Sequence, residues 1–200
     1  MNALVKRGSC HVFGDNIPLD EGFIPFELAI QRVTDPQKLI PHLFEKVAPG
    51  FAQRVKRGDI VAAGREFGNG KPHVQGFIAL HALDAGVICM SMPFKNLRRA
   101  VAKGLPVITG APAPADYAGA GDALEVDFAT GRAHNLTRGT EFTLPAMPPI
   151  LLDIVQRGGM NGLLKSWLAD HPEQAAGDED RALLEKINTT AITVVKKKAE

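Results

Sequence analysis

Short apolar runs alternate with helical patterns through the middle of the chain. Residues 59–64, 86–90 and 105–108 are each predicted to form a short buried strand. The segments between them, 72–83 and 93–103, are predicted to form helices. Three strands that alternate with two helices form a βαβαβ unit, which implies parallel pairing and right-handed crossovers.

A strand, a polar loop and a helix are predicted ahead of this unit. Residues 9–13 predict the strand, and the following loop over 14–25 is dense in glycine, aspartate, asparagine and proline. Asp35 is a suitable N-cap for the helix, and Pro36 suits its first position. The buried face of this helix is predicted from apolar residues at helical spacing: Leu39, Ile40, Leu43, Phe44 and Val47.

An antiparallel pattern follows the central unit. Short strands separated by turns are predicted over 123–128, 132–135 and 141–144. Strands so close in the sequence form a small meander. Two apolar helices are then predicted over 148–155 and 163–168.

The last part of the chain differs in composition from the rest. Residues 1–170 carry the apolar patterns and are predicted to form one domain. Residues 171–200 are polar and are interpreted as a C-terminal extension. This extension is expected to contain an exposed helix over 180–187.

The overall composition excludes several classes of protein. Hydrophobic residues make up 45% of the 200 residues and charged residues 22%, which is typical of a globular domain. A net charge of +1 argues against a nucleic-acid binder, which usually has a strong basic excess. The chain has no apolar run long enough to span a membrane and no apolar N-terminal leader. We therefore expect a cytoplasmic protein.

The two cysteines, Cys10 and Cys89, are far apart in the sequence. A zinc or iron–sulfur site normally needs three or four clustered ligands. Each cysteine lies in an apolar run, which favours a buried thiol. The sequence therefore predicts no metal site and no cofactor in this chain itself.

A glycine-rich turn, Gly64-Arg65-Glu66-Phe67-Gly68-Asn69-Gly70-Lys71, is predicted between a strand and a helix. It fails the P-loop pattern because Arg65 and Pro72 stand where that pattern needs glycine and serine or threonine. It fails the dinucleotide pattern because His73 stands at the last glycine. Backbone N–H groups at a helix N-terminus attract anions, and Lys71 and His73 favour a carboxylate there. The alternative is a tight turn in which the glycines only supply unusual backbone angles.

An ordered set of motifs from residue 14 to about 164 resembles the small subunit of 3-isopropylmalate dehydratase, the swivel domain of the aconitase superfamily. Gly14-Asp15-Asn16-Ile17 with Asp20 resembles the family's G-D-N-[IV]-x-T-D. The stretch FAQRVKRGDI over 51–60 resembles F-A-x-x-V-x-x-G-D-I, and GREFGNG over 64–70 resembles G-x-N-F-G-C-G. Gly104-Leu105-Pro106 resembles the G-L-P that follows the family's second helix.

This resemblance implies an α/β fold, a three-layer β/β/α swivelling domain with a parallel βαβαβ unit and a small antiparallel meander. It implies a large-subunit partner that holds a [4Fe-4S] cluster, and a small hydroxy-acid substrate that loses and regains water. In the family, the swivel domain supplies a serine base and an arginine that binds a substrate carboxylate. Neither nucleic acid nor a membrane is implied as a partner.

The chain departs from the family pattern directly after Gly70. The family reads S-S-R-E-H-A, whereas this chain reads KPHVQG over 71–76. The resemblance therefore places Lys71 at the serine base and His73 at the carboxylate-binding arginine, and Arg98 matches an arginine on the family's second helix. Lys71 is the candidate catalytic residue, and the candidate substrate-binding residues are Asp20, Asn69, Gly70, His73 and Arg98.

Two functions remain open on these residues. In the first, the chain is the small subunit of an aconitase-like hydro-lyase. In the second, it is a non-catalytic swivel domain that lost the serine and arginine and serves as a binding or structural protein. The segment 71–73 discriminates between them, because a lysine base needs burial or a neighbouring cation to lower its pKa.

Overall fold

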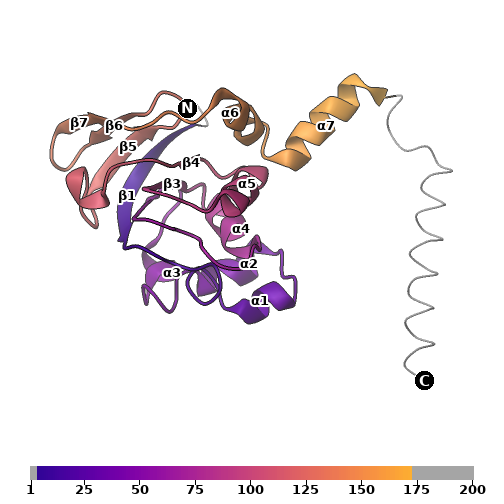
Figure 1. Ribbon diagram of the computed structural model, residues 1–200, viewed down its shortest axis with the longest axis horizontal. Coiled ribbons are helices and arrows are strands. Elements are labelled where there is room, and N and C mark those ends of the chain that lie inside the picture. The colour runs from indigo at the N-terminus through magenta and orange to yellow at the C-terminus, as the bar shows by residue number, and fades with distance from the viewer. Residues whose placement is uncertain (1–3, 173–200) are drawn as a thin grey trace. The chain divides into compact units, whose positions relative to one another are not determined.

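Seven strands form the framework of the fold (Figure 1). They are β1 (Val5–Phe13), β2 (Ile60–Ala63), β3 (Gly86–Cys89), β4 (Val107–Ile108), β5 (Ala123–Asp127), β6 (Arg132–Asn135) and β7 (Thr140–Thr143). The structure is a computed structural model that describes residues 4–172. The strands belong to one sheet in the order β4-β3-β2-β1-β5-β6-β7.

Helices connect these strands. They are α1 (Phe26–Ile30), α2 (Pro36–Leu39), η1 (Ile40–His42), α3 (Phe51–Arg54), α4 (Gln75–Ala82), α5 (Phe94–Ala102), η2 (Pro114–Asp116), α6 (Pro149–Gln156) and α7 (Met160–Asp170), where η denotes a 3₁₀ helix. None of the helices in the described range is long and apolar enough to cross a membrane.

Strand β1 joins the two halves of the sheet. Its first part, from Val5 to Ser9, pairs antiparallel with β5. Its last part, from Cys10 to Phe13, pairs parallel with β2, and β3 and β4 continue in parallel. Strands β5, β6 and β7 form the antiparallel meander. The predicted βαβαβ unit and the meander are both present.

Side chains of the parallel strands alternate between two cores, one on each face of the sheet. On one face, Val61 and Val87 pack with apolar residues of α2, α3, α4 and α5. On the other face, Ile60 and Ile88 pack with α6 and with residues of the meander, including Leu124 and Val126. The antiparallel half therefore curls over one face of the parallel half while helices cover the other. The three-layer β/β/α arrangement is confirmed.

The helix predicted from Asp35 to about residue 47 is wrong in its length. Asp35 caps a helix as expected, since its Oδ1 accepts a hydrogen bond of 2.9 Å from the Gln37 N–H. However, α2 ends at Leu39 and passes into the short 3₁₀ helix η1. Pro41 has no N–H and cannot continue the α-helical bonding pattern. Phe44 then has a φ of 55°, so its side chain reaches the core from a turn.

Two other differences lie close to the predicted site. The helix expected from Pro72 begins at Gln75, so residues 71–74 belong to a loop. The short helix α1 follows the polar loop, where no helix is predicted.

A further difference concerns the first strand. Strand β1 begins at Val5 and is four residues longer at its start than the strand predicted over 9–13.

The chain divides into two compact units between Leu163 and Leu164. The first unit contains the entire sheet and helices α1 to α6. In the second, the structure describes the end of α7 and the two residues that follow it. The division into a domain over 1–170 and an extension over 171–200 stays a prediction, and the helix predicted over 180–187 lies outside the described residues.

Candidate functional site

Two loops meet beyond the carboxyl ends of the neighbouring strands β1 and β2. The first covers residues 14–25 and the second residues 64–74. Four backbone hydrogen bonds join them: Gly64 N–H to Gly14 O at 3.2 Å, Asn16 N–H to Arg65 O at 2.7 Å, Gly68 N–H to Ile17 O at 2.7 Å, and Leu19 N–H to Asn69 O at 2.8 Å. In α/β sheets, ligands bind at this edge. The pairing brings Asp20 beside the segment 69–73.

An aromatic cluster fixes the second loop to the core. Phe67 is fully buried, and its ring centre lies 4.6 Å from that of Phe23 and 6.0 Å from those of Phe13 and Phe44. Gly68 follows with a φ of 76°, and an added Cβ would contact Phe23, Leu19 and Phe77. The glycine turn therefore packs tightly, and it presents residues 69–73 at its outer side.

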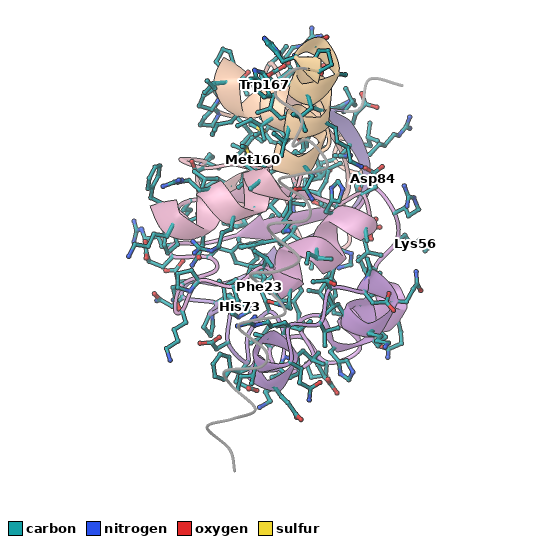
Figure 2. The ribbon with its side chains drawn as sticks, turned by 90° about the vertical axis from the view of Figure 1, so that its right-hand side faces the viewer. Phe23, Lys56, His73, Asp84, Met160 and Trp167 are labelled. Carbon is teal, nitrogen blue, oxygen red and sulfur yellow. The ribbon has the colours of Figure 1, made fainter. Side chains whose placement is uncertain are left out.

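Asp20 and His73 form the centre of the candidate site. His73 Nε2 lies 3.0 Å from Asp20 Oδ1, and the side chains are 11% and 30% exposed. Burial lowers the pKa of His73 below its ordinary value, although Asp20 and Gln75 act in the opposite direction. His73 is therefore a neutral imidazole near pH 7. Figure 2 shows it in the first unit together with Phe23 of the other loop.

Buried polar atoms without hydrogen-bond partners gather at this place. Among the residues that the structure describes, five such side-chain atoms occur: Asp20 Oδ1, His73 Nδ1, His73 Nε2, Asn96 Oδ1 and Tyr117 Oη. Asp20 Oδ1 and His73 Nε2 face each other at 3.0 Å without forming a hydrogen bond. Because buried polar groups in native proteins are normally paired, each exception needs an explanation. Four of the five belong to this site or to the helix beside it, which favours a binding function.

The candidate base Lys71 lies at the outer side of the same loop. Its side chain is exposed, and Nζ lies 5.8 Å from the ring centre of Phe26 in α1. The two neighbouring glycine-turn residues, Asn69 and Gly70, contact the first loop. Asn69 and Pro18 form an isolated parallel β-bridge, which is a backbone pairing. A Cβ added to Gly70 would lie 3.9 Å from Asp20 Oδ2.

Arg98 occupies a different position from the other candidates. It lies on the exposed side of α5, where its guanidinium stacks over the Phe94 ring at 5.7 Å. It has no acidic partner within the part of the chain that the structure describes. The structure therefore brings together Asp20, Asn69, Gly70 and His73, with Lys71 beside them, whereas Arg98 stands on the neighbouring helix.

Asn96 is a residue that sequence reasoning missed. It is 1% exposed, and its Nδ2 donates a 2.6 Å hydrogen bond to the carbonyl of Gly68. Asn96 thus ties α5 to the glycine turn. A signal was available, because Asn96 lies four positions before the buried Ala100 and so shares its helix face.

The stability of the chain is expected to fall as His73 takes up a proton. The lowered pKa means that the unfolded chain binds this proton at a higher pH than the folded chain. The contribution of neutral His73 is present above the ordinary pKa of about 6.5 and is lost as the pH falls through the lowered value. Urea unfolding between about pH 5 and pH 7.5 should therefore show a steeper loss for the native chain than for His73→Gln. Equal pH dependence in the two proteins would contradict this cause.

Comparison with known proteins places this geometry in a family, although no protein-family model matches the chain. A 3-isopropylmalate dehydratase small subunit from Moorella thermoacetica is 34% identical over 158 residues, which is 78% of this chain and 93% of the relative. The chain belongs to the family of 3-isopropylmalate dehydratase small subunits. The family resemblance of its motifs is thereby confirmed.

Other members of the dehydratase small-subunit family extend the match. A methanogen homoaconitase small subunit from Methanothermobacter thermautotrophicus is 35% identical over 176 residues, covering 88% of this chain and 98% of that protein. A crystal structure of 3-isopropylmalate dehydratase from Methanocaldococcus jannaschii has a TM-score of 0.76 at 26% identity. It covers 86% of this chain and 99% of that chain. The family therefore spans more than one named activity.

The two cysteines of this chain do not form an iron–sulfur cluster site. Cys10 belongs to the core on one face of the sheet and Cys89 to the core on the other. Burial raises the pKa of each thiol to about 12, so both stay protonated. Within residues 4–172, no group of three or more His, Cys, Asp or Glu side chains is placed to hold a metal ion.

Proposed function

We propose that this chain is the small subunit of an aconitase-like hydro-lyase that removes and re-adds water on a hydroxy acid carrying carboxylates. The observation that carries the proposal is the group of buried polar atoms on Asp20, His73 and Asn96 that lack hydrogen-bond partners. These atoms adjoin the loop at which the family binds substrate. The names of its relatives, 3-isopropylmalate dehydratase and homoaconitase, support a hydroxy-acid substrate.

Lys71 takes the role of general base in this proposal. The reaction needs a group that removes a proton from the carbon next to a carboxylate. A lysine does so only after its ammonium loses water or meets another cation, which lowers its proton affinity. Lys71 is exposed in the chain alone, so a partner that closes over the loop must supply that desolvation.

His73 and Arg98 take the role of carboxylate binding. Both nitrogens of His73 are covered in the chain alone, so contact with a substrate requires the ring to move from Asp20. A neutral imidazole then donates one N–H to a carboxylate oxygen. Arg98 supplies a guanidinium that matches a carboxylate with two parallel hydrogen bonds. Asn69 and Gly70 line the approach to both.

The partner in this proposal is an iron–sulfur large subunit. The cysteines and acidic groups of residues 4–172 do not fit a cluster, so the partner would have to carry it. A cluster iron supplies a Lewis acid for the substrate hydroxyl and carboxylate. Phe94, which is 70% exposed beside Arg98, supports docking at this side, because exposed aromatic residues are frequent anchors of interfaces.

Co-expression tests the proposal. The full chain is produced with the large subunit encoded nearest to it, purified without oxygen, and assayed for hydration and dehydration over a panel of hydroxy acids. We expect a complex whose iron and sulfide travel with the large subunit and whose activity needs both chains. A stable complex that is inactive on every acid would favour the non-catalytic swivel domain. If no complex forms, the proposal of a large-subunit partner is contradicted.

A further inference from the structure

A cavity of about 420 Å³ lies along the last part of β1, beside α3. Figure 1 shows where these two elements lie in the fold. It is lined by β1, by α3 and by the segment before β5, and it shares no lining residue with the Asp20–His73 site. Its volume lies within the range of about 300–1,000 Å³ that is typical of small-molecule sites. The family function described above leaves this cavity without a role.

The cavity opens where β1 loses its neighbour. Pairing with β5 ends at Ser9. Cys10 still bonds toward that side, because its N–H donates to Asp122 O and its C=O accepts from Gly121 N, both at 2.8 Å. Alternate residues of a strand direct their backbone groups to the same edge. Val12, whose Cα partner in β2 is Ala62, therefore directs its N–H and C=O to the opposite edge of β1, toward the cavity, where pairing with β5 has ended.

A buried aspartate holds a histidine in the wall of the cavity. His11 Nε2 lies 2.8 Å from Asp59 Oδ2, and Asp59 also accepts hydrogen bonds of 2.9 Å from the backbone N–H groups of Ser9 and Lys56. Because a carboxylate only accepts, Nε2 carries the proton. The Phe51 ring packs against the imidazole at 4.8 Å and fixes its plane. Nδ1 bonds to none of the described residues and is not sealed from solvent.

An arginine without an acidic partner stands at the rim. Arg54 Nη1 donates a 3.0 Å hydrogen bond to the carbonyl of Pro49. A Cβ added to Gly50 would lie only 2.8 Å from this nitrogen, so the glycine leaves the space that the guanidinium occupies. No carboxylate of residues 4–172 pairs with Arg54, and its Nε and Nη2 remain available. A held guanidinium of this kind is suited to a carboxylate.

We propose that this cavity binds a small 2-hydroxy or 2-amino carboxylic acid with an apolar side chain. The carboxylate pairs with Arg54, and the hydroxyl or amino group donates to His11 Nδ1. The apolar side chain lies against Phe51 and Ala48, which also line the cavity. The site is separate from the Asp20–His73 site and does not depend on the proposed hydro-lyase activity.

Three matched probes test each contact on the full 200-residue chain. Phenyllactate carries every group, 3-phenylpropionate lacks the hydroxyl, and phenyllactamide lacks the charge. Titrations are followed by the amide signals of Val12 and Gly121 and by the ring ¹⁵N signals of His11. We expect phenyllactate to shift these signals with a saturating curve, 3-phenylpropionate to bind more weakly, and phenyllactamide to bind most weakly.

Two variants distinguish this site from the Asp20–His73 site. Arg54→Gln should weaken phenyllactate binding at Val12 and Gly121 by about tenfold or more, since a hydrogen bond to a charged group is lost. His73→Ala should leave these shifts unchanged. Shifts confined to residues 69–73, equal binding of phenyllactamide, or binding that Arg54→Gln does not affect would each overturn the proposal.

Discussion

Lys71→Ala is expected to lower the kcat of the assembled enzyme by about 10²–10⁴-fold, the range that a general base contributes. The motif resemblance assigns Lys71 to the family's base position, and Lys71 follows directly on Asn69 and Gly70, which lie beside the first loop. Because Lys71 is exposed in the chain alone, the variant should fold normally, and co-purification with the large subunit checks that the complex still forms. Steady-state rates over a pH range measure the effect, and the ascending limb that a lysine base produces should disappear.

Two matched variants make this result specific. Lys38→Ala removes another exposed lysine, on α2, and should leave kcat unchanged. His73→Ala should mainly raise KM, because it weakens carboxylate binding without removing the base. If Lys71→Ala keeps full activity in an active complex, the base lies elsewhere, and the partner subunit becomes its expected source.

The strands and the long helices of this protein were predictable because their signals are local. The buried strands β2 and β3 are continuous apolar runs between polar residues, and α5 shows clear helical spacing. The course of residues 35–50 was not predictable from the same rules. The spacing of Leu39, Leu43 and Phe44 suits a helix, yet Pro41 interrupts it, and Leu39 reaches the core from α2 while Leu43 and Phe44 reach it from the turn after η1.

The candidate site was predictable in its members but not in its contacts. The resemblance placed Asp20, Asn69, Gly70 and His73 in one site, and the loop pairing does bring them together. Composition could not show that His73 would be covered, or that burial would outweigh Asp20 in setting its pKa. Both depend on packing between segments that are distant in the sequence.

The polar contacts around the cavity beside α3 could not be predicted from the sequence either. His11 and Asp59 lie in separate strand regions, and only the parallel register of β1 and β2 places them 2.8 Å apart. The relation between Gly50 and Arg54 is visible only in the structure, where the Arg54 guanidinium lies in the space that a Cβ at position 50 would fill. Sequence spacing therefore finds strands and helices, whereas polar clusters built across them emerge from the packing.

Phe67→Ala is expected to lower the free energy of unfolding by about 3–5 kcal/mol, the usual effect of truncating a buried phenylalanine. Phe67 is fully buried, and it packs against the rings of Phe13, Phe23 and Phe44. Denaturant unfolding measures the loss. Phe94→Ala is the matched control: because Phe94 is 70% exposed, its truncation should change stability by no more than about 0.5 kcal/mol.

The same residue links stability to the candidate site, because Phe67 lies in the turn that presents residues 69–73. Phe67→Leu keeps an apolar side chain that fills most of the same volume and should cost less than about 1.5–2 kcal/mol, so that the folded chain remains available for assay. In the active complex this variant should raise KM and lower kcat together, since the loosened turn carries both the base Lys71 and the carboxylate-binding His73. A loss for Phe67→Ala no larger than that for Phe94→Ala would contradict the anchoring role of the aromatic cluster.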